Sequence, residues 1–345
     1  MVIIMLSAPI RSCHALLAGL LLLTAQAHAV LFYDTADTTH NTTAPTGTYA
    51  DSGWQYEGLF GTFLGTAIAP GYFITAQHIG VPSSTFVSTA AFNGVADVTY
   101  NIDLTANGGA GYWNIAGTDF RIFKITGSFA EWAPLYTGAA ELGATIVTNG
   151  NGGPRGAAVM VDNGLGPELA GWKVTSGGLT GRWGTNQVSA IVPAGFSPVG
   201  SLLQADFNPL SGTDEAFLSG GDSGGGLFIK DSGIWKLAGV NYGIEGAFDT
   251  NGTIGDGTEF TAALFDKGGL YEGSDSGGWN FQTPTPLDQP ISFYASRISD
   301  SAGAISAIAV VPEPSSALLL LCALGLLGGR GRNSMHLNRG AVLRK

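Results

Sequence analysis

The sequence predicts an all-β fold, and three features of its composition and patterning favour this class. Glycine is unusually frequent, with 53 among 345 residues, and only 12% of the residues are charged. Thr, Val, Ile, Phe and Tyr gather in short runs separated by glycine turns, which is typical of strands joined by tight turns rather than of helices. A chain of this length can bury a large core, in one large domain or two small ones.

The first part of the chain is expected to form one antiparallel barrel, at about residues 45–135. A polar, turn-rich lead-in covers residues 30–58, and strand-like segments then alternate with glycine turns. These segments are 58–70, 71–78, 96–104 and 119–125.

A second set of strands follows a loop-like stretch at residues 127–143 and predicts a second barrel, at about 145–298. Its segments are 144–150, 157–164, 169–176, 187–195, 201–207 and 226–244. Two comparable sets imply two barrels packed together. A glycine-rich insertion (245–278), a Pro-rich connector (283–290) and a short closing helix within Ser299–Ala309 are expected after them.

The N-terminal residues 1–29 have the pattern of a secretory signal peptide. Arg11 precedes an apolar run that ends in the small-x-small pattern Ala27-His28-Ala29, which is typical of a cleavage site. We therefore expect the mature chain to begin at Val30. A membrane anchor is the alternative, but the apolar run is too short to span a bilayer comfortably.

The C-terminal residues 312–345 form a second separable segment. Residues 310–332 combine a Pro-Glu-Pro triplet, a short apolar run and an arginine cluster, in that order. This arrangement resembles the PEP-CTERM sorting signal of bacterial exported proteins. The resemblance implies processing by an exosortase-type enzyme, membrane contact only through the tail, and a secreted or surface location with transient anchoring. A plain transmembrane helix at Ala317–Leu327 is the alternative, and it would be short.

The composition of the remaining body, residues 30–311, excludes several kinds of chemistry. The two cysteines, Cys13 and Cys322, lie outside it, which rules out a disulfide framework, a thiol nucleophile and a Cys-ligated metal there. Nine Lys and Arg stand against 25 Asp and Glu, a net charge of about −16. Such a surface repels nucleic acid, so we expect no nucleic-acid partner, and nothing in the sequence indicates a cofactor.

Two histidines remain in the body. His40 lies in a Thr-rich polar stretch and is most simply a solvated loop residue. His78 ends the apolar segment 71–78, and a lone histidine there is more often a partly buried structural residue than a functional one. A functional role for His78 is therefore supported only if other catalytic groups accompany it.

Ser223 lies in the segment "GDSGGG", residues 221–226. A nucleophilic serine needs a tight bend that exposes its hydroxyl, with free backbone N–H groups facing the oxyanion that forms on attack. Glycines permit such a bend and let a substrate approach. The alternative is an ordinary glycine-rich turn.

Three motifs together resemble those of the chymotrypsin-like (trypsin-fold) serine endopeptidases. "ITAQH" at 74–78, "TDFRIFKI" at 118–125 and "GDSGGG" at 221–226 are similar to the histidine, aspartate and serine motifs of that family, in the same order. Gln77 and Arg121 depart from the usual pattern. The resemblance covers roughly residues 45–310. It implies two packed six-stranded antiparallel barrels with the active site in the cleft between them.

The resemblance also implies roles for individual residues. Ser223 would attack the scissile carbonyl, His78 would act as general base and then general acid, and Asp119 would orient the imidazole. Backbone N–H groups of Gly221 and Ser223 would form the oxyanion hole. The segment "LAGVNYG" resembles the strand that lines the substrate cleft, and the position six residues before the serine commonly forms the pocket floor. The substrate-binding candidates are therefore Phe217, Asn241, Tyr242 and Gly243.

Several alternatives to these assignments stay open. Asp119 is the favoured partner of His78, because it opens an apolar strand. Asp103 is the second candidate for orienting the imidazole, and Asp97 is a weaker one. The pattern Gly-x-Ser-x-Gly around Ser223 also fits the nucleophile elbow of α/β-hydrolases, but that fold needs a histidine after the serine. Only His336 of the tail follows, so an esterase would require the tail to fold in.

Asp222 raises a separate question, because in many relatives this aspartate pairs with a new N-terminus released by cleavage. Val30-Leu31-Phe32 lacks the glycines that usually help such a terminus to insert. The enzyme is then either active without activation cleavage, or Asp222 has another partner.

The sequence allows alternative interpretations of substrate preference, of metal binding and of catalytic activity. Phe217 does not support a preference for Arg or Lys, whereas Glu215 and Glu245 are candidates for one. The acidic stretch 249–259 could bind calcium, but it lacks EF-hand spacing, and we expect no metal site. The leading interpretation is a secreted serine endopeptidase. The alternative is a catalytically silent trypsin-fold protein that acts as an extracellular binding or matrix component.

Overall fold

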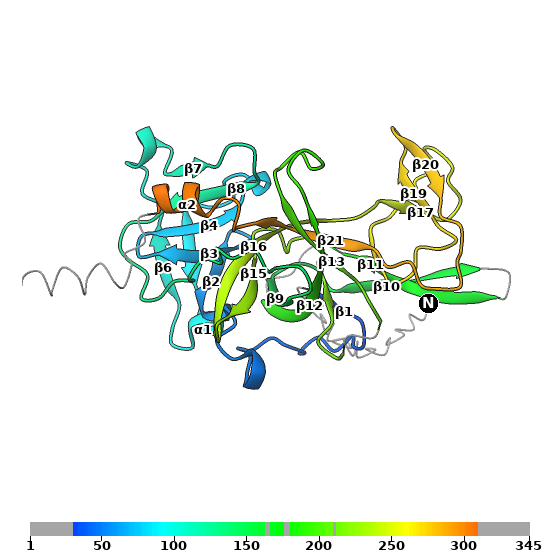
Figure 1. Ribbon diagram of the computed structural model, residues 1–345, viewed down its shortest axis with the longest axis horizontal. Coiled ribbons are helices and arrows are strands. Elements are labelled where there is room, and N and C mark those ends of the chain that lie inside the picture. Colours follow the sequence, from blue (N-terminus) through cyan, green and yellow to red (C-terminus); the bar gives the residue numbers. More distant parts are fainter. Residues whose placement is uncertain (1–29, 163–165, 176–179, 210–211, 310–345) are drawn as a thin grey trace, which may run out of the picture.

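The computed structural model describes residues 30–309 except 163–165, 176–179 and 210–211, and it is built almost entirely from strands (Figure 1). The expected signal peptide and sorting tail lie outside the described residues. Within the described part of the chain, no helix is both long and apolar enough to cross a membrane.

An open seven-stranded sheet forms the N-terminal part of the molecule, at the left of Figure 1. Its order is β6-β5-β2-β3-β4-β8-β7, and every pairing is antiparallel. The strands are β2 (Glu57–Phe60), β3 (Phe63–Ala69), β4 (Tyr72–Ala76), β5 (Thr85–Ser88), β6 (Val98–Asn101), β7 (Tyr112–Asn114) and β8 (Phe120–Lys124).

This sheet is not the closed six-stranded barrel that we expected. An isolated bridge between Ile102 and Ile125 brings the end of β6 beside the end of β8, so the sheet curls on itself. The curl wraps a core of aromatic rings: Phe73 stacks on Phe123 at 5.1 Å, and Phe60 packs edge-on against Phe73. The sequence predicts the strands, but closure depends on pairing between edges that strand patterns do not specify.

A closed six-stranded barrel forms the centre of the molecule and confirms one of the two expected barrels. Its strands follow the order β12-β13-β21-β16-β15-β9. They are β9 (Thr145–Gly150), β12 (Arg182–Val192), β13 (Leu202–Asp206), β15 (Gly226–Asp231), β16 (Ile234–Ile244) and β21 (Ser292–Arg297). Inward-facing residues such as Ile146, Leu203 and Phe293 are completely buried or nearly so.

Three small sheets extend the barrel, and strands β10, β11, β17, β19 and β20 of two of them lie at the right of Figure 1. Two segments that we assigned to the second barrel, 157–164 and 169–176, instead contribute their described residues to the projecting hairpin β10–β11. The sheets are β1 (Leu31–Phe32) with β14 (Ala216–Phe217), then β10 (Arg155–Asp162), β11 (Pro167–Val174) and β18 (Ala262–Leu264), then β17 (Phe248–Asp249), β19 (Tyr271–Ser274) and β20 (Gly278–Phe281).

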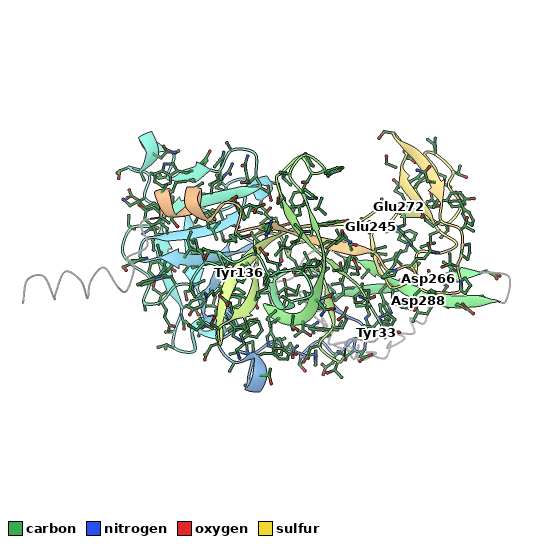
Figure 2. All side chains as sticks on the ribbon, viewed as in Figure 1. Tyr33, Tyr136, Glu245, Asp266, Glu272 and Asp288 are labelled. Atoms are coloured by element: carbon green, nitrogen blue, oxygen red, sulfur yellow. The ribbon has the colours of Figure 1, made fainter. Side chains whose placement is uncertain are left out.

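Aromatic packing fixes the projecting hairpin to the N-terminal segment and to the residues that follow β18. Tyr33, labelled in Figure 2, makes edge-on contacts with two other rings. Its ring lies 5.8 Å from Trp172 of β11 and 5.2 Å from Phe265. The Arg155 guanidinium lies 3.7 Å above the Trp172 ring. Edge-on aromatic and cation–π contacts add to the area they bury, so this sheet has a firm base.

Helices are few and short within the described residues. The expected closing helix is confirmed as α2 (Ala302–Ile308), whose Ile305 is fully buried. Its N-cap Ser301 makes no side-chain capping hydrogen bond. The others are α1 (Ala90–Asn93) and the 3-10 turns η1 (Gly47–Tyr49), η2 (Trp54–Tyr56), η3 (Gln77–Ile79) and η4 (Asn107–Gly109).

The open sheet and the barrel share one hydrophobic core, so they pack as a unit. Leu64 and Ile74 of the sheet join Val147, Phe228 and Val240 of the barrel in a single cluster. About 25 cal/mol is gained for each Å² of apolar surface that such packing removes from water. The candidate site lies where these two halves meet.

A buried carboxyl crosses the same boundary. Glu57 of β2 accepts hydrogen bonds from Thr66 (3.1 Å), from Asn149 of β9 (3.3 Å) and from the Gly226 N–H of β15 (3.0 Å). Its other oxygen is buried without a partner among the described residues. Burial raises the pKa of Glu57 to about 8, because the three donors do not offset the loss of water around the charged form.

The free energy of unfolding is therefore expected to fall as the pH rises from about 4.5 to about 8. The folded state keeps the Glu57 proton over this range and the unfolded state releases it, so the loss is on the order of 4 kcal/mol. Glu57→Gln should remove this contribution to the profile, whereas the exposed Glu168→Gln should leave it unchanged. Urea unfolding at pH 5 and pH 8 measures how far the free energy of unfolding falls between these two pH values. An equal fall in the wild type and in both variants would show that Glu57 is already ionised in the folded protein.

Candidate active site

Ser223 lies in the loop between β14 and β15, and glycine is needed at two positions of this loop. Gly221 and Gly224 have φ angles of +108° and +87°. A Cβ atom on Gly224 would lie 2.3 Å from Thr75 Oγ1 and 2.4 Å from the Leu64 carbonyl oxygen, so no side chain fits there. The loop thus docks tightly on the open sheet and carries Ser223 across to it.

His78 reaches the same place from the open sheet. Strand β4 ends at Ala76, and the 3-10 turn η3 directs the next residues toward the barrel. Asp119, which immediately precedes β8, fixes this turn: its carbonyl oxygen accepts from Gln77 N (2.6 Å), and its Oδ1 accepts from His78 N (2.9 Å). Pairing of β4 with β8 therefore brings the two motifs together.

The three side chains form a continuous hydrogen-bonded relay. Asp119 Oδ2 lies 2.6 Å from His78 Nδ1, and His78 Nε2 lies 2.8 Å from Ser223 Oγ. An ionised carboxylate accepts only, so it fixes the proton on Nδ1 and leaves Nε2 to accept from the serine hydroxyl. The Asp119 side chain is 5% exposed and that of His78 is 39% exposed, so a substrate can reach the imidazole while the carboxylate is shielded.

The alternative aspartates do not approach His78. Asp103 accepts hydrogen bonds from Thr105 and forms an ion pair with Lys124 at 3.0 Å. Asp97 accepts from the Ala90 N–H at 2.7 Å. Both carboxylates are thus engaged in local contacts, and Asp119 is the aspartate beside the imidazole.

The second histidine of the body makes its own contact elsewhere. His40 Nε2 lies 2.9 Å from Asp214 Oδ1, and its ring packs edge-on against Phe32 at 4.7 Å. His40 is therefore held in the N-terminal segment rather than left as a solvated loop residue.

A pocket of 220 Å³ opens beside Ser223 and contains two of the predicted substrate-binding residues. Tyr242 and Gly243, near the end of β16, both line it. The Tyr242 ring also lies edge-on to His78, with 5.6 Å between the ring centroids. The structure therefore brings these two residues to the site.

The other two predicted substrate-binding residues have buried side chains and are not among the residues that line the pocket. Phe217 is fully buried in β14, where it packs against Phe207 and Phe293, because pairing with β1 turns it into the core. Asn241 is also fully buried and donates to the carbonyl oxygens of Asn149 (2.8 Å) and Asp222 (3.3 Å). The Asn241 side chain thus links β9 to the loop that carries Ser223.

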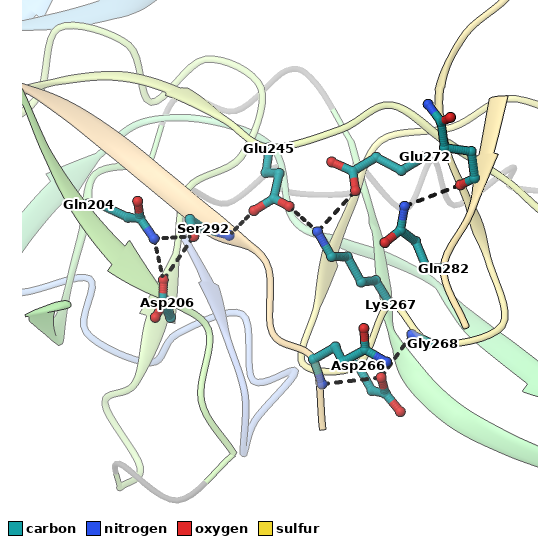
Figure 3. A network of polar contacts seen from close by, with 11 residues as sticks. Gln204, Asp206, Glu245, Asp266, Lys267, Gly268, Glu272, Gln282 and Ser292 are labelled. Carbon is teal, nitrogen blue, oxygen red and sulfur yellow. Dashed lines mark hydrogen bonds and ion pairs between the residues drawn. The ribbon is translucent and has the colours of Figure 1, made fainter. Parts of the chain in front are cut away.

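Neither acidic candidate for recognising a basic substrate lies in the pocket. Glu245 accepts from the Ser292 N–H (2.9 Å) and forms an ion pair with Lys267, which also pairs with Glu272 at 2.9 Å (Figure 3). Glu215 is 1% exposed and accepts from the Asn208 N–H. Both are structural carboxylates.

The backbone N–H groups predicted for the oxyanion hole lie in the same loop. Gly221 and Ser223 line the pocket, and between described residues neither N–H donates a hydrogen bond. Unused donors on a tight turn beside a hydroxyl can stabilise a developing oxyanion.

Asp222 is completely buried, and its carboxylate contacts the start of the described chain. Its carboxylate accepts from Ser219 N (2.6 Å), Gly152 N (2.7 Å) and Val30 N (3.2 Å). Burial raises its pKa to about 6, since three neutral donors do not replace the lost water. We did not expect the Val30 contact, although the cleavage pattern before Val30 marked this residue as a terminus.

No group of three or more metal-ligating side chains occurs in the part of the chain that the structure describes. In the acidic stretch 249–259, Asp249 and Asp256 both accept from Thr258, and Asp256 also accepts from Asn251. These contacts hold the loop together from within.

No protein-family model matches the chain, and neither does any curated protein. Among solved structures, the chain is similar to the passenger domain of plasmid-encoded toxin, an autotransporter enterotoxin from enteroaggregative Escherichia coli. The two are 14% identical, with a TM-score of 0.37. The match covers 61% of this chain and 21% of that one, so the chain spans about a fifth of that protein's length. A likeness at this level carries no information about the site.

Proposed function

We propose that the protein is a serine endopeptidase whose catalytic domain spans residues 30–311. The observation that carries the proposal is the relay from Asp119 through His78 to Ser223, in which both imidazole nitrogens lie within hydrogen-bonding distance of a partner. A serine hydroxyl is a weak nucleophile unless an oriented base takes its proton. The resemblance of the three motifs to the chymotrypsin-like family supports the same conclusion.

The relay suits acyl transfer in two steps. Ser223 Oγ attacks the substrate carbonyl carbon while its proton passes to His78 Nε2, and the N–H groups of Gly221 and Ser223 bind the oxyanion. His78 then protonates the amine as the C–N bond breaks, leaving an ester on Ser223. Water enters, gives a proton to His78 and attacks the ester, and the proton returns to Ser223 as the acid leaves. Asp119 stabilises the imidazolium in each half-reaction.

The proposal includes export. Residues 1–29 would direct secretion, and residues 312–345 would hold the enzyme at a bacterial surface until an exosortase-type enzyme processes them. Peptide or protein substrates would be its partners. The acidic surface disfavours nucleic acid.

Peptide hydrolysis distinguishes this proposal from a catalytically silent binding protein. The purified protein should cleave casein or quenched fluorescent peptides, and Ser223→Ala should not. Equal signals from the two proteins would remove the enzymatic function and favour the binding role.

A further inference from the structure

The pocket beside Ser223 has side walls made of uncharged groups. Val174, Leu218 and Ile244 supply aliphatic surface, and Tyr242 and Thr261 add a ring edge and a small hydroxyl. Ser219 also lines the pocket, but its hydroxyl already donates to the Gly153 carbonyl oxygen at 2.8 Å. At 220 Å³ the pocket is smaller than the roughly 300–1,000 Å³ of typical small-molecule sites, and it suits a single side chain.

Among the described residues of the lining, the one carboxylate cannot serve a cationic substrate. Asp222 is completely buried, and both of its oxygens already accept backbone N–H groups, from Val30, Gly152 and Ser219. Glu245 is paired with Lys267 and lies outside the pocket lining. A lysine or arginine side chain in this pocket would therefore lose water without gaining an opposite charge.

One wall of the pocket comes from the three-stranded sheet β10-β11-β18 and the residue before β18, rather than from the barrel. Val174 ends β11, and its N–H donates to the Thr261 carbonyl oxygen at 2.8 Å, so the two residues are tied together. Trp172, two residues earlier, is held by Tyr33 and Arg155 at the base of the sheet. The wall is thus fixed in place, and the residues that close the pocket lie outside the three motifs.

We propose that this pocket selects an uncharged, apolar side chain on the substrate residue that precedes the cleaved bond, with Val174 and Thr261 as specificity-determining residues. The inference rests on the proposed peptidase function and adds the substrate class. Leu, Met and Phe should be preferred over Lys, Arg, Asp and Glu. The expected ratio of kcat/KM is about 100-fold or more, because an apolar pocket gains roughly 10-fold or more per fitted methylene and gives an ion no partner.

Quenched fluorescent peptides that differ only at this residue test the inference on the full processed protein. Val174→Asp and Thr261→Asp, on the same wall, should each shift the Leu-to-Lys ratio toward Lys by about 10-fold or more. Thr261 is exposed, so its variant tests the wall even if Val174→Asp fails to fold. Val98→Asp, on the distant strand β6, is the matched control and should keep the wild-type ratio.

A second experiment tests the apolar preference separately from the proposed peptidase activity. Peptide aldehydes ending in Leu or Phe should protect Ser223 from a fluorophosphonate probe at lower concentration than those ending in Lys or Arg. The apolar preference would be wrong if the probe labels Ser223 but aldehydes ending in Lys or Arg protect it as well as, or better than, those ending in Leu or Phe. The peptidase function would still hold in that case. No labelling and no cleavage of any peptide would remove both.

Discussion

His78→Ala is expected to lower kcat for peptide hydrolysis by about 10⁴-fold or more. The imidazole is the only base within hydrogen-bonding distance of Ser223 Oγ among the described residues, at 2.8 Å. Without it the hydroxyl keeps its proton, and nothing protonates the leaving amine. Asp119→Asn should cause a loss of similar order, because an amide that donates to Nδ1 selects the wrong tautomer.

The variants should also be strongly non-additive. Once His78 is gone, Ser223 cannot be activated, so the double variant His78→Ala/Ser223→Ala should have the same residual rate as Ser223→Ala alone. His40→Ala is the matched control, since His40 also pairs with an aspartate, at 2.9 Å, and makes no contact with Ser223. Multiplying losses, or an equal loss in His40→Ala, would contradict the relay.

A chain whose first residue is Val30 is expected to be on the order of 10²-fold or more active than the same chain extended at Val30. Val30 N lies 3.2 Å from the buried carboxylate of Asp222, which directly precedes Ser223. Cleavage after Ala29 would replace an amide at this point by an ammonium group. Losing one partner of a buried ion pair costs about 3–5 kcal/mol, enough to disorder the loop that carries the oxyanion donors.

A removable N-terminal fusion measures this effect. Release that leaves Val30 first should raise activity, whereas release that leaves one additional glycine before Val30 should not. Asp222→Asn should abolish the difference between the two products. If both termini give equal activity, the contact between Val30 and Asp222 only fixes the strand β1.

Pairing with a new ammonium should also remove the effect of pH at Asp222. In the extended chain the pKa of about 6 lies above the ordinary value of 3.8, so unfolding becomes easier as the pH rises between these values. An adjacent positive charge would lower that pKa and remove the loss.

The sequence predicts the central part of this site because each motif is short and local. A strand that ends in His78, a strand that begins after Asp119 and a glycine loop around Ser223 can each be recognised without knowing their neighbours. Their meeting needs only the pairing of β4 with β8 and the docking of one loop on the open sheet.

The pocket could not be predicted in the same way. Counting six residues back from Ser223 assumes a fixed loop path, but pairing with β1 turns Phe217 into the core. Val174 and Thr261 are far apart in sequence and meet through the pairing of β11 with β18. Segments 157–164 and 169–176 have the same patterning as barrel strands, and only their distant partner places them in another sheet.

Mass spectrometry of the protein after reaction with a fluorophosphonate tests the central claim most directly. An activated serine forms a stable covalent adduct, whereas an ordinary surface hydroxyl does not. The relay predicts one adduct per chain on Ser223, which is lost in His78→Ala and retained in His40→Ala. The absence of an adduct, or an adduct on Ser223 that persists without His78, would contradict it.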